Sequence, residues 1–181
     1  MTIHAGDPFE LPDDPVRRLR GRLGGRVSLW TAGEVTAGTG VVGERAGLTV
    51  TSLMIAGGEP AHVLGLIDPD SDLREVAEET GGAVVSLLES RHRHLAEAFG
   101  GTMPAPGGPF RLTEWTQTRW GPHPAEVSTW AGIRIESLVP VGWSLLVTGA
   151  IEELAVGDDA VPLFHRRGRL IGEQSGATGD E

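Results

Sequence analysis

The clearest alternation of apolar and polar positions lies in residues 47–54, Gly-Leu-Thr-Val-Thr-Ser-Leu-Met. Because successive strand side chains point to opposite faces of a sheet, this run predicts a single β-strand. One face carries Leu48, Val50, Ser52 and Met54, and the other carries Thr49, Thr51 and Leu53. Three closely spaced hydroxyl groups suit a polar ligand lying along the strand, although Thr and Ser also occur in ordinary strands.

Several other segments have the apolar content and the bounding turn residues of strands. They are 26–31, 62–67, 83–88, 130–136, 144–154 and 163–171, with a turn at 156–159 between the last two. A helix is predicted where a capping residue precedes apolar residues at helical spacing and glycine follows. Three segments meet these conditions: one from Asp14 to Gly24, one from Ser71 to Gly81, and one from Ser90 to Gly100.

Strands therefore outnumber helices, and the helices are too few to serve as crossovers in a parallel sheet. The sequence predicts a mainly β protein built on an antiparallel barrel, with a few short helices. A length of 181 residues fits one domain, which we place at 13–172. The ends, 1–12 and 173–181, are expected to be a flexible N-terminus and a disordered tail.

Composition excludes several kinds of chemistry. All 15 basic residues are arginine, which excludes lysine Schiff bases and a P-loop lysine. The absence of cysteine excludes disulfides, thiolate nucleophiles and cysteine-bound metals. A net charge of -10 argues against nucleic-acid partners. The N-terminal residues resemble no secretory signal, and no apolar run approaches the ~20 residues that cross a bilayer, so we expect a cytoplasmic protein without membrane contact.

The histidines give no metal site. His92 and His94 are two positions apart on a predicted helix, so they face different directions, and we expect both on a solvated face. His123 lies in Pro-His-Pro, which predicts a turn. A further group of basic residues near the C-terminus is either a weak anion-binding patch or a set of ordinary charged residues on an edge strand. It consists of His165, Arg166, Arg167 and Arg169.

The order of these segments resembles that of the flavin reductase family, FMN-binding split-barrel proteins that reduce flavin with NAD(P)H. Residues 46–52, Ala-Gly-Leu-Thr-Val-Thr-Ser, are similar to the family's Gly-hydrophobe-Thr-Val-Ser-Ser strand, and Glu59-Pro60 resembles the turn after it. Residues 162–170 resemble the closing strand. Further matching segments are 26–31, 62–67 with Ser71, 83–88, 94–99, and 120–124 followed by 131–136, so the resemblance covers about residues 20–171.

The resemblance implies an FMN-binding split barrel, an antiparallel and Greek-key-like barrel that binds FMN or FAD. The expected flavin contacts are Thr49, Val50, Thr51 and Ser52 at the ring and ribityl chain, and Asp68 and Ser71 near the ribityl or phosphate end. A helix starting at Ser71 can receive a phosphate, because its first amides have no intrahelical partner. The alternative is that Ser71 only caps the helix and Asp68 only shapes a turn.

Two positions depart from the family pattern. Where members often have Gly-Asp-His, with the histidine beside the nicotinamide, this chain has Gly142-Trp143-Ser144. Trp143 either stacks on the flavin or nicotinamide, or belongs to the core or an interface. The loop 68–72, Asp-Pro-Asp-Ser-Asp, is acidic where members offer Asn, Lys or Arg. We expect Arg166, Arg167 or an arginine of a second subunit to offset its charge.

Three functions remain open. The first is an NAD(P)H:flavin oxidoreductase that passes electrons to free flavin, a monooxygenase partner or a small acceptor. It needs no catalytic side chain, because the flavin carries the hydride chemistry. The second is a flavin-binding carrier or sensor without nicotinamide turnover, and the third is a split barrel that uses a deazaflavin or haem. Five tryptophans in a chain without tyrosine favour a homodimer, since interfaces are enriched in tryptophan.

Overall fold

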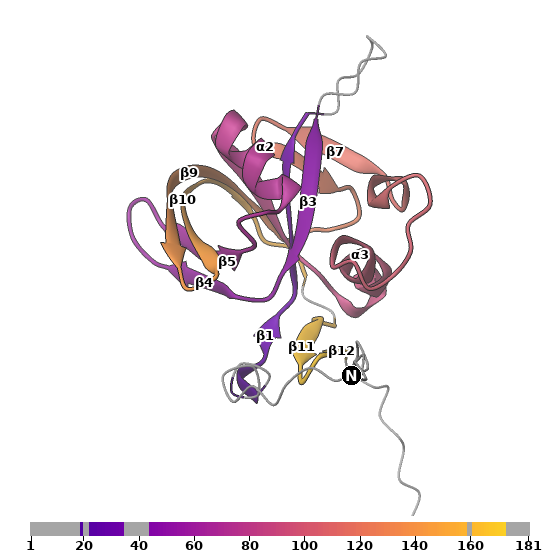
Figure 1. Cartoon of the computed structure of the whole chain (residues 1–181). Helices are drawn as coiled ribbons and strands as arrows, with labels where there is room; N and C mark the ends of the chain where they lie inside the picture. Colours follow the sequence, from indigo (N-terminus) through magenta and orange to yellow (C-terminus); the bar gives the residue numbers. More distant parts are fainter. Residues whose placement is uncertain (1–18, 20–21, 35–43, 159–160, 173–181) are drawn as a thin grey trace, which may run out of the picture.

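A seven-stranded antiparallel sheet forms the body of the protein, in the order β3-β2-β6-β9-β10-β5-β4 (Figure 1). The computed structural model describes residues 19, 22–34, 44–158 and 161–172. The strands of the sheet are β2 Ser28–Gly33, β3 Arg45–Val50, β4 Leu53–Ala56, β5 His62–Ile67, β6 Gly82–Leu87, β9 Trp130–Val141 and β10 Ser144–Ala155. The prediction of a mainly β antiparallel barrel is confirmed.

The two edge strands of this sheet are consecutive in the chain. Only Thr51 and Ser52 separate β3 from β4, so the sheet must curl until its opposite edges meet. Ser52 links the junction between β3 and β4 to β5. Its Oγ donates to the Leu66 carbonyl at 2.8 Å and accepts from the Leu66 N–H at 3.1 Å. We call Thr51, Ser52 and Leu66 the seam. The prediction of one strand over 47–54 is therefore wrong, since the chain changes pairing partners at the seam.

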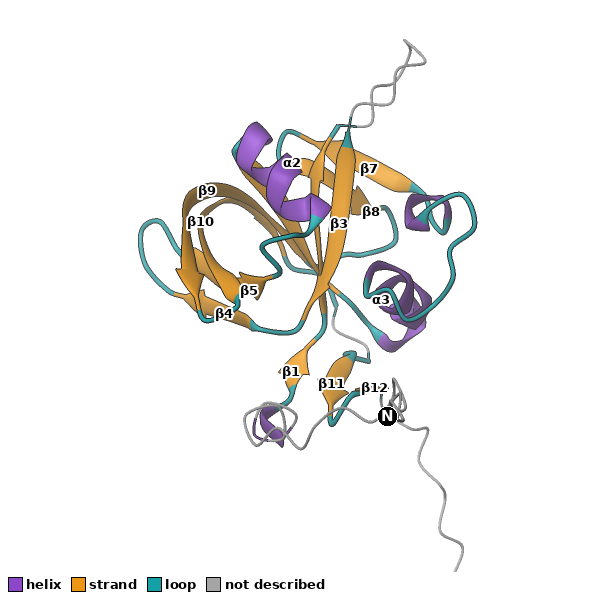
Figure 2. Ribbon diagram, viewed as in Figure 1, coloured by secondary structure: helices purple, strands orange, loops and turns teal. Residues whose placement is uncertain are grey.

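Two small sheets and several short helical segments complete the described part of the fold (Figure 2). One sheet has the order β1-β11-β12, and the other pairs β7 with β8. Their bounds are β1 Gly25–Arg26, β7 Trp115–Thr118, β8 Gly121–Pro124, β11 Phe164–Arg166 and β12 Arg169–Ile171. The strand expected at 163–171 is thus a hairpin, which turns where Arg167 and Gly168 have φ angles of 52° and 76°. The helical segments are α2 Asp72–Thr80, η1 Ser90–His92, α3 Arg93–Phe99 and η2 Pro109–Arg111.

The helix α2 forms as its sequence predicts. The Ser71 Oγ accepts the Arg74 N–H at 3.3 Å, and Gly81 ends the helix with a left-handed φ of 74°. Its apolar side, Leu73, Val76 and Ala77, is buried in the barrel core. Of the first predicted helix, positions 19 and 22–24 are described: 19, 22 and 23 are helical, and Gly24 follows with a left-handed φ of 68°. The rest of this segment lies outside the described residues, as do the two predicted flexible ends. No helix in the described part of the chain is long and apolar enough to cross a membrane.

Trp30 fills the barrel interior. Its side chain is almost fully buried, and its Nε1–H donates to the Ser28 Oγ at 3.0 Å, which itself donates to the Val50 carbonyl at 2.7 Å. The indole ring lies directly over Gly65 of β5, where a Cβ atom would come within 2.7 Å of the ring. Close packing of this kind leaves the interior to side chains, so a ligand has to bind outside the barrel.

Three histidine and capping predictions are wrong. The turn before α3 begins at Glu89 instead of Ser90, because η1 precedes the helix. His92 is fully buried instead of solvated, and its Nδ1 accepts the Glu89 N–H at 3.1 Å. His123 lies in strand β8 instead of a turn, and it stacks on Trp130 with ring centroids 4.6 Å apart.

Candidate functional site

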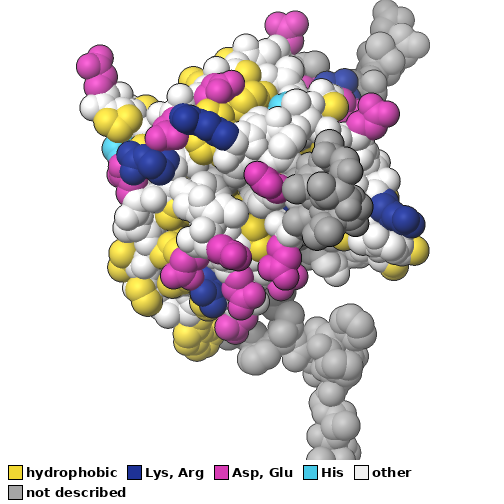
Figure 3. All heavy atoms as spheres, turned by 90° about the horizontal axis from the view of Figure 1, so that it is seen from above, with side chains coloured by type: hydrophobic (Ala, Val, Ile, Leu, Met, Phe, Trp, Pro, Cys, Tyr) yellow, Lys and Arg dark blue, Asp and Glu magenta, His cyan; other side chains and the backbone are white. Residues whose placement is uncertain are grey.

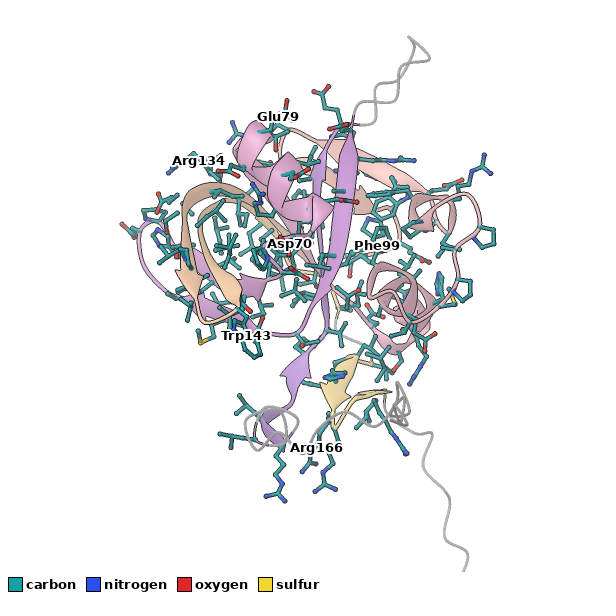
Figure 4. All side chains as sticks on the ribbon, in the orientation of Figure 1. Asp70, Glu79, Phe99, Arg134, Trp143 and Arg166 are labelled. Carbon is teal, nitrogen blue, oxygen red and sulfur yellow. The ribbon has the colours of Figure 1, made fainter. Side chains whose placement is uncertain are left out.

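The structure gathers predicted site residues at the seam. Thr51 and Ser52 form it, and β5 opposite them leads within a few residues to Asp68 and Ser71. The hairpin of β9 and β10 brings Trp143 to the same end of the barrel, because β10 pairs with β5 in the register Leu145 to Ile67. Figure 4 shows Asp70 between α2 and β5, and Trp143 at the tip of that hairpin.

The hydroxyl groups of the predicted strand are used unequally. The Thr49 Oγ1 donates to the Ala96 carbonyl of α3 at 2.8 Å, and the Ser52 hydroxyl is bonded across the seam. The Val50 side chain is buried in the core. Thr51 is half-buried, and its hydroxyl forms no hydrogen bond with any described residue. Thr49 and Ser52 can therefore only accept further hydrogen bonds, whereas Thr51 can also donate one.

The acidic loop is held by its own hydrogen bonds. The Asp68 Oδ1 accepts the Asp70 N–H at 2.9 Å, and the Ser71 Oγ donates to the Asp68 carbonyl at 2.7 Å. Both residues thus have the turn and capping roles that the sequence allowed. The guanidinium of Arg74 donates from Nε to the Pro69 carbonyl at 3.1 Å. Arg74 is therefore a cation at this loop that sequence reasoning missed.

Arg74 also interacts with two carboxylates of its own helix. Its closest carboxylate is that of Glu78, 2.7 Å from the guanidinium, and Glu75 lies at 3.9 Å. The hydrogen bond to Glu78 raises the pKa of Arg74 above its usual range. The i to i+4 spacing of Arg74 and Glu78 was the sequence signal that could have identified this pair. Figure 3 shows more acidic than basic side chains on the face it presents.

The small sheet approaches the seam through Gly25. A Cβ at this position would lie 2.3 Å from the Thr51 carbonyl, so only glycine lets β1 pass this close. His165 pairs with Gly25 and is half-buried, whereas Arg167 is exposed at the hairpin turn two residues further on. The structure therefore brings His165 near the seam and leaves Arg167 farther out.

Trp143 is the most exposed large apolar residue described, at 97%. It follows Gly142, whose left-handed φ of 58° suits the hairpin turn. The interpretation of Trp143 as a core residue is wrong, while stacking on a ligand and contact with a second chain both stay open. The other tryptophans are packed within the chain: Trp30 and Trp120 are buried, and Trp115 and Trp130 are half-buried.

A comparison with protein families decides the family. Residues 20–172 match the sequence profile described as the flavin reductase like domain. The chain belongs to the flavin reductase-like family. No curated protein matches the sequence significantly.

Solved structures of flavin reductases share this fold at low sequence identity. The flavin reductase PheA2 is 17% identical with a TM-score of 0.76, and the match covers 91% of this chain and 100% of that one. The NADH:FAD oxidoreductase SgcE6 of Streptomyces globisporus C-1027 is 22% identical with a TM-score of 0.74, covering 91% and 98%. The styrene monooxygenase flavin reductase of Pseudomonas putida S12 is 19% identical with a TM-score of 0.74, covering 89% and 98%. The family's split-barrel architecture is thus confirmed for this chain.

Proposed function

We propose that this flavin reductase-like protein binds a flavin, FMN or FAD, at the seam and reduces it with NAD(P)H. The observation that carries the proposal is the convergence of Thr51, the loop at Asp68 and the start of α2, in a chain that matches the flavin reductase like domain over 20–172. Thr51 and the residues around it would hold the flavin, which would supply two-electron transfer from NAD(P)H to free flavin, a monooxygenase partner or a small acceptor.

The donor set at the seam fits a flavin. The pyrimidine edge of the ring has carbonyl oxygens that need donors and an N–H that needs an acceptor, and backbone groups with one free hydroxyl supply both. Thr51 has that hydroxyl among the described residues, and the Thr49 and Ser52 oxygens can accept. The first amides of α2 point toward the loop and suit a phosphate. The carboxylates beside them oppose it, and Arg74 partly offsets their charge.

A bound flavin supplies the hydride acceptor, so the protein residues orient the two substrates and exclude water. Thr51 and the neighbouring backbone fix the edge of the ring. Trp143 offers a flat apolar surface at the same end of the barrel, where it can stack on the flavin or the nicotinamide at about 0.5–1.5 kcal/mol beyond area burial. His165 and Arg167 stand on the other side of Thr51, beyond β1, as candidate contacts for anionic groups.

A carrier or sensor without nicotinamide turnover is the second candidate. The observation in its favour is Trp143-Ser144, which stands where family members often have Asp-His. An exposed indole can cover a bound flavin, and a covered flavin would be protected from NAD(P)H.

We also propose a homodimer that uses the outer face of β4, β5, β10 and β9. Met54, Leu66 and Val139 are 61%, 39% and 48% exposed on this face, and Trp143 lies at its end. Exposed apolar patches above a few hundred Å² usually mark interaction sites. Sedimentation should give twice the 19.1 kDa of the chain, and Leu66→Glu should give monomers. A wild-type protein that sediments as a monomer contradicts this assembly.

The reaction itself is tested in two steps. Purified protein titrated with FMN or FAD should quench flavin fluorescence at one site per chain, and a deazaflavin or haem spectrum in the purified protein would refute the flavin assignment. Anaerobic NADH or NADPH should then bleach the absorption band of the bound flavin. Persistent colour with both nucleotides refutes the reductase and leaves the carrier.

Partner transfer is tested separately. Two structural relatives belong to systems with a partner enzyme: the styrene monooxygenase flavin reductase named above, and BorF, the flavin reductase component of a bacterial two-component tryptophan halogenase. If this chain serves such a partner, its free reduced flavin should support that enzyme in a coupled assay.

The role of Thr51 is tested by a variant of matched shape. Thr51→Val keeps the shape of the side chain and removes its hydroxyl, so it should weaken flavin binding without changing the fold. Equal affinity in Thr51→Val and wild type removes Thr51 from the site.

A further inference from the structure

The outer face of the β1-β11-β12 sheet has a composition unlike the rest of the protein. In this sheet, Phe164 pairs with Ile171, and Arg166 pairs with Arg169. Because directly paired residues lie on the same side of a sheet, these four side chains share one face, and Arg26 joins them opposite Phe164. We call these five residues the arginine face. His165, Gly25 and Leu170 lie on the opposite side, where Leu170 packs against the core.

The arginine face combines exposed apolar groups with cations. Phe164 is 45% exposed and Ile171 is 44% exposed, and both Arg166 and Arg169 are exposed beside them. The Arg26 guanidinium lies over the Phe164 ring, 5.8 Å from its centre. The apolar pair of Phe164 and Ile171 thus has one guanidinium over its ring and the Arg166–Arg169 pair beside it.

The electrostatics of this region are opposite to those of the whole chain. The net charge is -10, yet 22–33 and 161–172 contain no Asp or Glu. In the part of the chain that the structure describes, Arg166, Arg167 and Arg169 form no ion pair. Like charges directly opposite each other destabilise a strand pair. The Arg166–Arg169 pair therefore destabilises the pairing of β11 with β12. An anion bound between the two arginines would remove that repulsion.

We propose that the arginine face binds the adenosine diphosphate portion of a dinucleotide, which FAD and NAD(P)H share. Adenine stacks on the exposed Phe164 ring beside Ile171, and the diphosphate accepts hydrogen bonds from the forked guanidinium groups of Arg166 and Arg169. Strand β1 connects the face to the seam, because Arg26 follows Gly25 and Gly25 approaches the Thr51 carbonyl from the opposite side of the sheet. A dinucleotide that reaches both the seam and the arginine face passes around the free edge of β1. The inference rests on the proposed function for the identity of the dinucleotide, but not for the binding of ADP itself.

The test is calorimetric titration of the flavin-free protein with ADP, adenosine and inorganic pyrophosphate at low ionic strength. ADP should bind more tightly than either fragment, and salt should weaken its binding. Replacing both arginines, Arg166→Gln with Arg169→Gln, should weaken ADP binding by about tenfold or more. Phe164→Leu should weaken ADP but not pyrophosphate. Arg134→Gln is the matched control, since Arg134 lies on β9, far from this sheet in Figure 4.

Two results overturn the proposal. One is equal affinity for ADP and pyrophosphate, which would leave no role for Phe164. The other is a double arginine variant that binds ADP as tightly as Arg134→Gln does. Should the double glutamine variant lose its folded circular dichroism spectrum, Arg166→Lys with Arg169→Lys takes its place. It keeps the charges but not the forked donors, so it should still bind ADP more weakly than wild type. A folded lysine variant that binds ADP as tightly as wild type refutes the guanidinium contact.

A second comparison identifies the dinucleotide. If FAD is the occupant, it should bind more tightly than FMN, and the double arginine variant should remove the difference. If NADH is the occupant, NADH should bind more tightly than reduced nicotinamide mononucleotide, and the double arginine variant should remove this difference. No preference in either pair overturns the proposal. ADP binding without any flavin reduction would instead refute the proposed reductase while leaving this site intact.

Discussion

The packing of Trp30 over Gly65 gives the sharpest test of how the barrel is built. In Gly65→Ala, the new methyl group would lie 2.7 Å from the indole Cζ2 and 2.9 Å from Cη2, well inside normal contact. The ring cannot retreat freely, because its Nε1–H is bonded to the Ser28 Oγ, and Ser28 is bonded to β3. Overpacking of a filled core costs about 1–3 kcal/mol of unfolding free energy.

Urea unfolding followed by tryptophan fluorescence and circular dichroism measures this loss. For a chain of this size, each kcal/mol lowers the melting temperature by about 2–4 °C. Gly57→Ala is the matched control, since a Cβ there meets nothing within 4 Å. It should change stability by no more than about 1 kcal/mol, in the stabilising direction if at all. Equal midpoints for the Gly65 and Gly57 variants would refute the packing of Trp30 against β5.

Three further predictions concern the seam, a buried histidine and the approach of β1. Ser52→Ala removes both side-chain bonds to β5 and should lower the free energy of unfolding by about 1 kcal/mol in urea titrations, because the site is exposed to water. Burial lowers the pKa of His92 below its usual 6.5, so below that pH the unfolded chain binds the extra proton. Stability should therefore fall on acidification by up to about 1.4 kcal/mol per pH unit, and His92→Gln should flatten that slope. Gly25→Ala should displace β1 from Thr51 and weaken flavin binding in fluorescence titrations; unchanged affinity would separate β1 from the site.

Local signals in the sequence predicted α2 almost completely. Ser71 as N-cap, Gly81 as the left-handed stop and the burial of Leu73 all depend on residues within one or two turns. Interactions at this range are encoded by neighbouring residues, so propensity and spacing suffice to predict them.

Long-range contacts set the limits of that prediction. The break at Thr51 and Ser52 depends on closure of the whole sheet, which no local pattern reports. The Thr49 hydroxyl donates to a carbonyl 47 residues away, and the buried His92 lies 3.9 Å from the carboxylate of the distant Glu126. The sequence thus identified a segment rich in hydroxyl groups, while the structure determined which of these hydroxyls can still donate a hydrogen bond.

The position of the flavin is the central claim, and amide chemical shifts report it directly. A titration of isotope-labelled protein with FMN should shift the resonances of 50–53 and 68–73 most strongly. The amide signals around Glu152 of β10, which forms an ion pair with Arg134, should stay unchanged. Shifts confined to other surfaces, with 50–53 unaffected at saturating FMN, would contradict the seam as the flavin site.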